Sequence, residues 1–514
     1  MKCFMGIDAG TSGIKAVILD ETGRIVGSGY HECDIIPPRP GWVEQTPEVW
    51  WQACSAAAKQ AAASSGCGMQ VAGIGFSGQM QGCQLLDRDY QPIGNCIIWL
   101  DQRSSREVEE IEQLIPDEES IGITANHCLN SFWAPKLLWL RKNRPQDYER
   151  AAKVVFAKDY IRYRMTGELA ADVSDASLSF LMDVPGRCWS KTMFSRLGID
   201  ISLAPERLAG SADVVGTLLP AVAEDWGVPA GIPVVAGGGD QPAGGVGTGI
   251  VRPGILGATI GTSGVVFGCT AEPMVDTEKR AIMTMAHSEP NTWCFLGLVL
   301  SAGGAFKWLR DTVFTHEKAA CAASGQEVYD CMTALAAQAR PGCEGLVFLP
   351  YLNGEKTPIS DENARGVFFG LSLRHGLPEI TRSVMEGVTF AMRDTVEICR
   401  ELGMSVDEIR ANGGGAKSPL WLQMQADIYK TSVVTTNIDE GPAAGGAIMA
   451  AVGAGYFSGV TEGCDSWLKI SHRVDPDPEV CKIYDDCYQS YKDLYPALKE
   501  RFASQAALLE KHMS

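Results

Sequence analysis

Short apolar runs that stop at glycines dominate the hydrophobic pattern of this 514-residue chain. Residues 5–20 (MGIDAGTSGIKAVILD) place one apolar run before and one after a Gly-Thr-Ser-Gly tetrapeptide. Residues 257–270 (GATIGTSGVVFGCT) repeat this arrangement about half a chain later. Such runs, broken by Gly, Ser and Thr, are typical of two strands joined by a tight turn. The two copies predict a duplicated architecture, with chance similarity as the alternative.

Two further apolar runs, at 234–239 (VVAGGG) and 409–417 (IRANGGGAK), predict strands that end in glycines. After the second, Ser418 and Pro419 supply a helix N-cap and a first-turn proline. The apolar side chains that follow recur at every fourth position and predict one buried stripe: Leu420, Met424 and Ile428.

The composition divides the chain into three parts. We expect a first domain over residues 1–250, which ends in the glycine-rich stretch GGVGTGIVRPG, and a second domain over residues 251–475. Residues 476–514 begin with Pro and acidic residues and predict one or two amphipathic helices. The aromatic stripe of this tail is assigned to core packing: Tyr484, Tyr488 and Tyr491.

The bulk composition excludes several function classes. A hydrophobic content of 46% and a charged content of 21% are those of a soluble globular protein. The net charge of −18 argues against nucleic acid and anionic membranes as partners. No apolar run approaches the roughly 18 residues of a membrane span, and no signal core precedes the first glycine. The seventeen cysteines lack metal or disulfide spacing, so we expect reduced thiols in the cytoplasm.

The two predicted hairpins have a composition suited to phosphate. Glycines allow close backbone approach, successive N–H groups form an anion-binding nest, and Thr and Ser hydroxyls add donors. Asp8 ends the first strand, where a carboxylate could hold hydrated Mg²⁺ beside phosphates. Lys15, on the returning strand, is a candidate phosphate partner or, alternatively, a solvated strand residue.

Other nucleotide and hydrolase motifs do not fit. The chain has no G-x-x-x-x-G-K-[ST] sequence, which excludes a P-loop. A G-x-G-x-x-G match at Gly73, Gly75 and Gly78 leads into QMQGC and QLLD. These letters predict a turn and a strand, whereas a dinucleotide site needs a helix there. The segment GFSGQ is one glycine short of a nucleophile elbow.

One carboxylate, Asp240, stands among five glycines in residues 234–245 (VVAGGGDQPAGG). An ordinary turn is the simplest interpretation, since Asp tolerates turns. The alternative is a catalytic loop in which glycines let two reactants approach one acid closely.

Nine segments, in order along the chain, resemble the FGGY family of carbohydrate kinases, and its xylulokinases most. They are GIDAGTSGIKAVI, GFSGQMQG, IIWLDQR, GGGDQPAGGVGTG, IGTSGVV, LPYLNGEKTP, ARGVFFGLS, NGGGAKSPLWLQMQADI and EGPAAGGAIMAAVG. The resemblance implies an α/β, two-domain actin/hexokinase-like (ribonuclease H-like) ATPase fold with a central cleft. Domain 1–250 would hold the sugar and a phosphate hairpin, domain 251–475 would bind ATP, and 476–514 would be a helical extension.

The resemblance also implies roles for individual residues. Asp240 would be the general base, and Asp8 and Asp240 together would hold Mg²⁺. The residues implied for sugar binding are Gln79, Met80, Gln81, Trp99, Asp101, Asp240 and Gln241, with Arg103 nearby. The residues implied for ATP binding are Gly10, Thr11, Ser12, Lys15, Gly261, Thr262, Gly303, Lys307, Gly414, Gly415 and Ala416. Core packing of Trp99 and a structural ion pair between Asp101 and Arg103 remain alternatives.

The sequence departs from the xylulokinase pattern where the sugar is read. Gln81 replaces His, Leu100 replaces Asn and Gln241 replaces Asn. We expect D-xylulose as the acceptor, giving D-xylulose 5-phosphate. Ribulose, gluconate, fuculose, erythritol and glycerol are the alternative acceptors. The superfamily also contains non-kinase ATPases, which need the phosphate hairpins but no sugar pocket. A homodimer is the default for soluble enzymes of this kind, and the sequence leaves the oligomeric state open.

Overall fold

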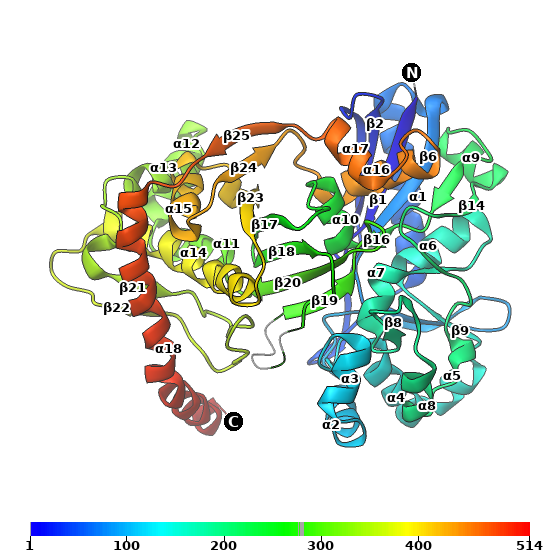
Figure 1. The fold of residues 1–514 in the computed structure, drawn as a ribbon, viewed down its shortest axis with the longest axis horizontal. Helices are drawn as coiled ribbons and strands as arrows, with labels where there is room; N and C mark the ends of the chain where they lie inside the picture. Colours follow the sequence, from blue (N-terminus) through cyan, green and yellow to red (C-terminus); the bar gives the residue numbers. More distant parts are fainter. Residues whose placement is uncertain (1, 276, 278–281, 514) are drawn as a thin grey trace.

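The computed structural model describes residues 2–275, 277 and 282–513. Within these residues the fold is built on two seven-stranded sheets (Figure 1). The strands of the first sheet are, in spatial order, β14 (Val214–Thr217), β15 (Pro233–Val235), β6 (Val71–Gly78), β1 (Cys3–Ala9), β2 (Gly13–Asp20) and β3 (Ile25–Glu32), with β16 (Gly238–Gly239) also paired to β6. The strands of the second are β19 (Ile282–Ala286), β20 (Trp293–Val299), β18 (Gly264–Thr270), β17 (Gly254–Ile260), β23 (Val406–Gly413), β24 (Val433–Thr436) and β25 (Ile470–Val474).

Smaller sheets surround these two. A five-stranded sheet contains β4 (Ile36–Arg39), β5 (Trp42–Gln45), β8 (Pro92–Ile97), β7 (Cys83–Leu86) and β9 (Lys153–Val155). Three strand pairs are β10 (Ala171–Asp172) with β13 (Leu208–Ala209), β11 (Met182–Asp183) with β12 (Cys188–Trp189), and β21 (Val347–Leu349) with β22 (Val367–Phe369).

Helices cover the faces of these sheets. In the first half of the chain they are α1 (Pro47–Ser65), α2 (Ser105–Leu114), α3 (Asp117–Thr124), α4 (Trp133–Asn143), α5 (Pro145–Arg150), α6 (Ala157–Thr166), α7 (Val173–Ala176), α8 (Lys191–Leu197), α9 (Pro220–Trp226) and α10 (Asp240–Gly247). In the second half they are α11 (Gly303–Thr312), α12 (Thr315–Ser324), α13 (Val328–Ala336), α14 (Leu377–Glu401), α15 (Pro419–Tyr429), α16 (Gly441–Gly453), α17 (Val460–Trp467) and α18 (Pro478–Met513).

The predicted duplication is confirmed by the strand order. In the first sheet the antiparallel hairpin β1–β2 lies between the parallel strand β6 and the antiparallel strand β3. In the second sheet the hairpin β17–β18 lies in the same way between the parallel strand β23 and the antiparallel strand β20. Each Gly-Thr-Ser-Gly tetrapeptide forms the turn of its hairpin. The G-x-G-x-x-G segment continues from β6 through a turn into β7, as predicted, and no helix follows it directly.

Helix α16 packs on strands of the other half of the chain. A Cβ atom on Gly6 would lie 1.8 Å from the Ala443 carbonyl oxygen, and one on Gly247 would lie 1.7 Å from that of Gly441. Only glycine permits backbones to approach this closely, so α16 can press against β1 and cross α10. Residues 441–468, which connect strands β24 and β25 of the second sheet, therefore share a hydrophobic core with Phe4 and Val17 of the first.

The local predictions for the second half of the chain are confirmed. The Ser418 hydroxyl accepts the Trp421 N–H at 3.3 Å and caps α15, which starts at Pro419. Met424 and Ile428 are buried and Leu420 is partly buried. The tail forms one long helix, α18, and its tyrosine stripe lies in the core: Tyr484, Tyr488 and Tyr491.

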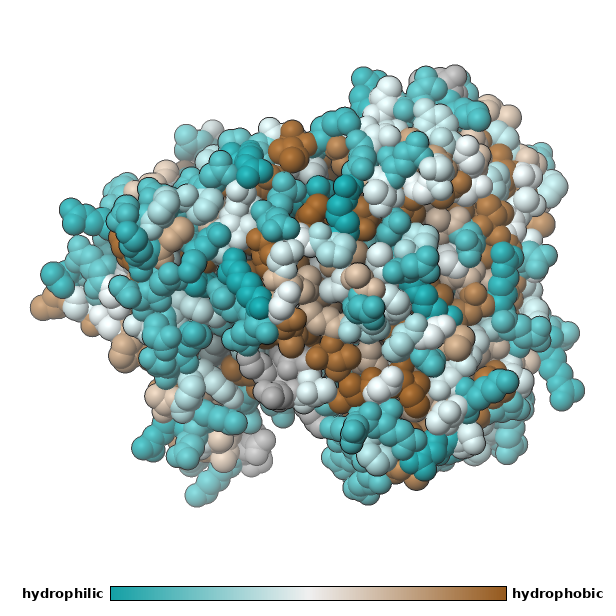
Figure 2. All heavy atoms as spheres, in the orientation of Figure 1, coloured by the Kyte–Doolittle hydropathy of each residue, from teal (hydrophilic) through white to brown (hydrophobic). Residues whose placement is uncertain are grey.

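The surface in the view of Figure 1 is mostly polar. Figure 2 shows hydrophilic side chains over most of this face, with hydrophobic side chains in scattered groups. None of the helices in the described part of the chain combines the length and the apolar character of a membrane span.

Candidate active site

Two carboxylates lie at the same edge of the first sheet. Strand β6 pairs with β1 on one side, where Ser77 faces Asp8, and with β16 on the other, where Ser77 faces Gly238. Asp240 follows β16 directly. The sequence placed Asp240 in a loop, and this is wrong: Asp240 is the first residue of helix α10. The helix starts there because Gly239 is still extended and Asp in a first helical turn is favoured by the positive end of the helix dipole.

Burial and the charge of a neighbouring carboxylate, Glu440 for Asp8 and Asp8 for Asp240, raise the pKa values of these two acids. Burial foremost, and then the charge of Asp8, raise the pKa of Asp240 to about 7. Hydrogen bonds from the backbone and side chain of Gln241 oppose this rise. The pKa of Asp8 is also raised, chiefly by burial, although the Ser77 hydroxyl donates to its Oδ1 at 2.8 Å. A pair of crowded carboxylates next to each other favours either a shared proton or a cation.

A buried ion cluster, which sequence analysis missed, holds the chain just before Asp240. Lys158 Nζ lies 2.7 Å from an oxygen of Asp172 and 3.1 Å from one of Asp175. The Asp172 carboxylate accepts the Ser174 hydroxyl at 2.5 Å, and Ser174 Oγ in turn accepts the Gly239 N–H at 3.0 Å. The cluster therefore fixes the start of α10. The only sequence signal was the acidic stretch DVSDAS, which has no local pattern that pairs it with a lysine.

The same cluster supports the turn predicted to bind sugar, Gln79–Met80–Gln81. Gln81 adopts a left-handed conformation (φ 66°), its N–H donates to Asp175 at 3.3 Å, and its carbonyl accepts Lys136 Nζ at 2.9 Å. Met80 packs closely against Gly239, because a Cβ there would lie 2.6 Å from the Met80 side chain. The turn thus lies against the residue that precedes Asp240.

Gln79 and Trp99 join the first hairpin in one polar network. The Gln79 side-chain amide donates to Gln45 at 2.7 Å, and the Thr11 hydroxyl donates to the Gln79 carbonyl oxygen at 3.3 Å. The Trp99 indole N–H donates to Thr11 Oγ1 at 2.9 Å, and 42% of the Trp99 residue surface remains exposed. An exposed aromatic face that is fixed by a hydrogen bond is more suited to ligand contact than to core packing.

Asp101 has structural partners instead. Arg103 donates to both of its carboxylate oxygens, at 2.8 and 2.7 Å, and the Val43 N–H donates at 2.5 Å. Arg103 also pairs with Glu44 and lies over the Trp42 ring, and the side chains of Asp101 and Arg103 are fully buried. This geometry favours the ion-pair interpretation, and a sugar contact by Asp101 stays a prediction.

In the first hairpin, Lys15 forms an ion pair with Glu440, the residue before α16. Gly10, Thr11, Ser12 and Lys15 lie at the turn near Asp8 and Trp99 and do not line the nucleotide-sized pocket described next.

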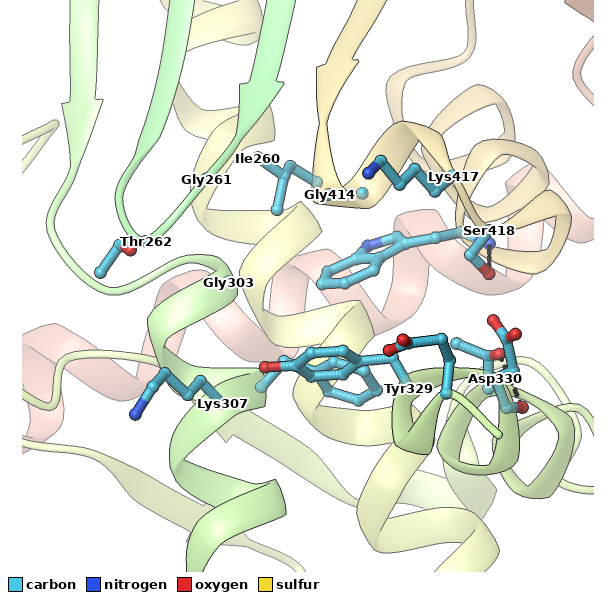
Figure 3. A pocket seen from close by; sticks show the side chains of 15 residues that line it. Ile260, Gly261, Thr262, Gly303, Lys307, Tyr329, Asp330, Gly414, Lys417 and Ser418 are labelled. Atoms are coloured by element: carbon cyan, nitrogen blue, oxygen red, sulfur yellow. Dashed lines mark hydrogen bonds between the residues drawn. The ribbon is translucent and has the colours of Figure 1, made fainter. Parts of the chain in front are cut away.

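A pocket of about 570 Å³ opens in the second half of the molecule. It contains six of the residues predicted for ATP: Gly261, Thr262, Gly303, Lys307, Gly414 and Gly415. Figure 3 shows Thr262 and Lys307 on one side of the pocket, Ser418 and Asp330 on the other, and Gly414 above Tyr329. Ala416, the remaining predicted residue of this group, packs against the hydrophobic core beside the pocket.

The walls of this pocket include aromatic residues that sequence analysis did not identify. Phe306 stacks with Tyr329 at 5.7 Å between ring centroids and meets the Trp421 ring edge-on at 5.3 Å. Flat apolar surfaces of this kind suit a nucleobase. The other missed lining residues are Ile260, Glu327, Asp330, Thr333, Lys417 and Ser418. Nothing in the helical pattern of 328–336 distinguished Tyr329 from an ordinary packing residue.

Backbone contacts hold the second hairpin against helix α11. The Gly303 N–H donates to the Gly261 carbonyl at 2.8 Å, and the N–H groups of Ala302 and Gly304 donate to the Thr262 carbonyl at 3.1 and 2.9 Å. A Cβ on Gly303 would lie 2.3 Å from that Gly261 oxygen, so glycine is required there. Lys307 Nζ is paired with Asp311 at 2.8 Å.

No group of three or more His, Cys, Asp or Glu side chains in the described residues has the arrangement of a metal site. Two carboxylates such as Asp8 and Asp240 are enough protein ligands for Mg²⁺, because this ion keeps several waters and takes further oxygens from phosphates. The charge of Asp8 raises the pKa of Asp240, and a dication would relieve this repulsion.

Comparison with known proteins agrees with this geometry. Residues 3–247 match the N-terminal domain model of the FGGY family of carbohydrate kinases, and residues 256–454 match its C-terminal domain model. The xylulose kinase of Escherichia coli (strain K12) is 36% identical over 496 residues, covering 96% of this chain and 99% of that protein. The xylulose kinase of Klebsiella pneumoniae is 37% identical, covering 87% of this chain and 89% of its own.

The solved structure of a "xyloylose kinase" from Brucella ovis is 33% identical, with a TM-score of 0.88 over 97% of this chain and 99% of that one. The two domain models match in family order, and the relatives align over nearly the full length of the chain. The chain therefore belongs to the FGGY family of carbohydrate kinases and is a phosphotransferase that uses an alcohol group as acceptor.

Proposed function

We propose that this kinase transfers the γ-phosphoryl group of Mg-ATP to D-xylulose, giving D-xylulose 5-phosphate, with Asp240 as general base. The observation that carries the proposal is the Asp240 carboxyl, buried beside Asp8 at the start of α10, with a pKa of about 7. A base with a pKa near the working pH combines a useful ionised fraction with a strong proton affinity. The xylulose kinases named above support D-xylulose as the acceptor.

In this mechanism the Asp240 carboxylate accepts the proton of the sugar hydroxyl as that oxygen attacks the γ-phosphorus. The new O–P bond forms as the bond to the β-phosphate oxygen breaks, and ADP leaves. Mg²⁺, held by Asp8 and Asp240 when bound, would neutralise charge on the phosphates. The Gly261–Thr262 turn would position the triphosphate, and the Phe306, Tyr329 and Trp421 rings would hold the base.

The sugar side of the proposal depends on the first domain. Gln81, which lies on the supported turn, and Gln241, which hydrogen-bonds to Asp240, would contact the acceptor in this proposal. Leu100 packs as a partly buried apolar residue and offers no hydrogen bond. Ribulose, gluconate, fuculose, erythritol and glycerol remain the alternative acceptors.

The seventeen cysteines are all free, which fits a reducing cytoplasm as the site of action.

ADP release, measured with ATP and a panel of pentuloses, hexuloses, polyols and sugar acids, tests the proposal. D-xylulose should give the highest kcat/KM, and ADP release without acceptor should be far slower. A different preferred acceptor would replace the sugar and leave the kinase mechanism in place. Equal rates with and without any acceptor would contradict the proposed mechanism.

A further inference from the structure

A buried glutamate supports the second phosphate turn from behind. Glu355 lies in the loop between β21 and β22, and only 1% of its surface is exposed. Its Oε1 accepts the Leu300 N–H at 2.8 Å and the Lys356 N–H at 2.8 Å. Its Oε2 is buried and has no hydrogen-bond partner among the described residues. This carboxyl therefore holds the residue that follows strand β20.

The neighbouring Thr357 adds a second link to the same strand. The Thr357 N–H donates to the Leu298 carbonyl at 3.0 Å, and the Leu298 N–H donates to Thr357 Oγ1 at 2.9 Å. Glu355 and Thr357 thus anchor this loop to the end of β20 through one backbone and two side-chain hydrogen bonds. The loop is anchored in turn by α18, because the Tyr495 hydroxyl donates to Asp361 at 2.8 Å.

The residues that follow this end of β20 hold the second predicted phosphate turn. The N–H groups of residues 302–304 donate to the carbonyls of Gly261 and Thr262, as described above. Only Ser301 separates Leu300 from this segment. Any shift of Leu300 is therefore transmitted within two residues to the N–H groups that hold the turn.

We propose that Glu355 is a positioning residue for ATP, which sets the Gly261–Thr262 turn through Leu300. The inference rests on the proposed function to the extent that this turn binds the phosphates of ATP. It concerns nucleotide affinity and is independent of which sugar is the acceptor.

The charge state of Glu355 provides a distinctive readout. Burial foremost, and also the charge of Asp394, raise the pKa of Glu355 to about 8, against the backbone N–H groups of Leu300 and Lys356. The other charged groups that line the adjacent cavity are Lys356, Asp361 and Glu362. The hydroxyls of Tyr351 and Tyr491 also lie near Glu355 and are hydrogen-bonded to each other at 2.8 Å.

It follows that Glu355 is mostly a neutral acid at pH 7 and an anion at pH 9. A buried anion with one unpartnered oxygen, next to the phosphate turn, should weaken binding of a triphosphate. The ATP affinity of the wild type should then fall as the pH rises through about 8.

The test compares Glu355→Gln, Glu355→Ala and the wild type by calorimetric titration with ATP, without sugar, from pH 6.5 to 9.5. The wild-type Kd for ATP should rise about 3- to 10-fold between pH 7 and pH 9. Glu355→Gln, which keeps the shape and cannot ionise, should match the wild type at pH 7 and lack the wild-type rise in Kd above pH 8. Glu355→Ala should weaken ATP binding about tenfold at every pH, because Leu300 loses its partner.

Steady-state kinetics supply the second readout and a control. Glu355→Ala should raise the KM for ATP and leave the KM for the sugar nearly unchanged. Glu386→Gln is the matched control, because Glu386 is also buried but its partners include Arg382 at 2.8 Å, Gly342 and Tyr484, none of which belongs to residues 300–304. This control should lower Tm without changing the KM for ATP.

Two results would overturn the inference. One is a Glu355→Gln variant that keeps the wild-type fall in ATP affinity above pH 8, because another group would then cause it. The other is an equal rise of both KM values in Glu355→Ala, which would indicate a general loss of packing. If Glu355→Ala fails to fold, the Glu355→Gln pH profile decides alone. A wild type that binds no ATP at all would instead contradict the proposed function.

Discussion

The two Gly-Thr-Ser-Gly hairpins have the same sequence at their turns and different surroundings. At the first, the Thr11 hydroxyl is engaged by Trp99 and Gln79, and Asp8 stands two residues before Gly10. At the second, Thr259 takes the position of Asp8, and the turn lines a pocket with aromatic walls. Under the proposed function, the same turn backbone would therefore serve the metal and the acceptor in one domain and the nucleotide in the other. The neighbours of each hairpin decide which.

The largest effect should come from Asp240, which adjoins only the first hairpin. Asp240→Asn keeps the shape and removes the base, so kcat should fall about 10²–10⁴-fold with sugar affinity little changed. The wild-type kcat should fall as the pH drops through about 7, because the base becomes protonated. Rapid-quench kinetics and sugar calorimetry measure the two quantities. Loss of sugar binding with kcat preserved at saturation would make Asp240 a binding residue.

The same variant should affect stability in the opposite direction. The pKa of Asp240 is raised from 3.8 to about 7 in the folded protein, so its ionised form is disfavoured by folding. The contribution of this group to stability is full below pH 4 and is lost as the pH rises towards 7. Asp240→Asn should therefore have a higher Tm than the wild type at pH 8 and a similar Tm at pH 4.

Replacing Asp8 and, separately, Thr259 at the matching position of the second hairpin tests the comparison directly. Asp8→Asn should lower kcat about 10²–10³-fold, because one of two charges that hold Mg²⁺ is removed. Thr259→Val, at the matching position of the second hairpin, should change kcat less than about 2-fold. Circular dichroism would verify that both variants fold. Similar losses in both would mean that the two hairpins do not divide their roles as proposed.

A smaller effect should separate the two turn threonines. Thr262→Val should raise the KM for ATP about tenfold and leave the sugar KM unchanged, because a donor to a charged phosphate is lost. Thr11→Val should raise both KM values, because Thr11 also fixes Trp99 and Gln79. If both variants affect only ATP, then Thr11 has no influence on the acceptor side.

The smallest and most specific effect concerns the acceptor. The triple variant Gln81→His, Leu100→Asn and Gln241→Asn restores the pattern expected for xylulokinases. Its kcat/KM for D-xylulose should rise relative to that for other acceptors, by about tenfold if a buried hydroxyl gains one partner. A wild type that already prefers D-xylulose, and a triple variant that loses this preference, would show that these positions do not select the sugar as proposed.

Much of the local structure could be predicted from the sequence, because it depends on short-range geometry. The glycine turns of both hairpins, the Ser418 cap and the buried tyrosines of α18 each follow from a few neighbouring residues. The resemblance to the FGGY family also identified Asp8 and Asp240 as candidate site residues. The start of α10 at Asp240 was misassigned, since the five glycines and one proline of residues 234–245 give no helical periodicity.

Only the tertiary structure decided which distant residues meet. Lys158 pairs with Asp172 and Asp175, and Glu355 accepts a hydrogen bond from Leu300. Tyr329 and Trp421, 92 positions apart in sequence, line the same pocket. Such contacts are set by strand order and helix packing, which bring together segments whose own sequences show no mutual pattern. The sequence by itself determined the two Gly-Thr-Ser-Gly turns and the acids near one of them. Long-range packing determined what holds each turn in place, because a buried charge or carboxyl is stable only where distant partners converge on it.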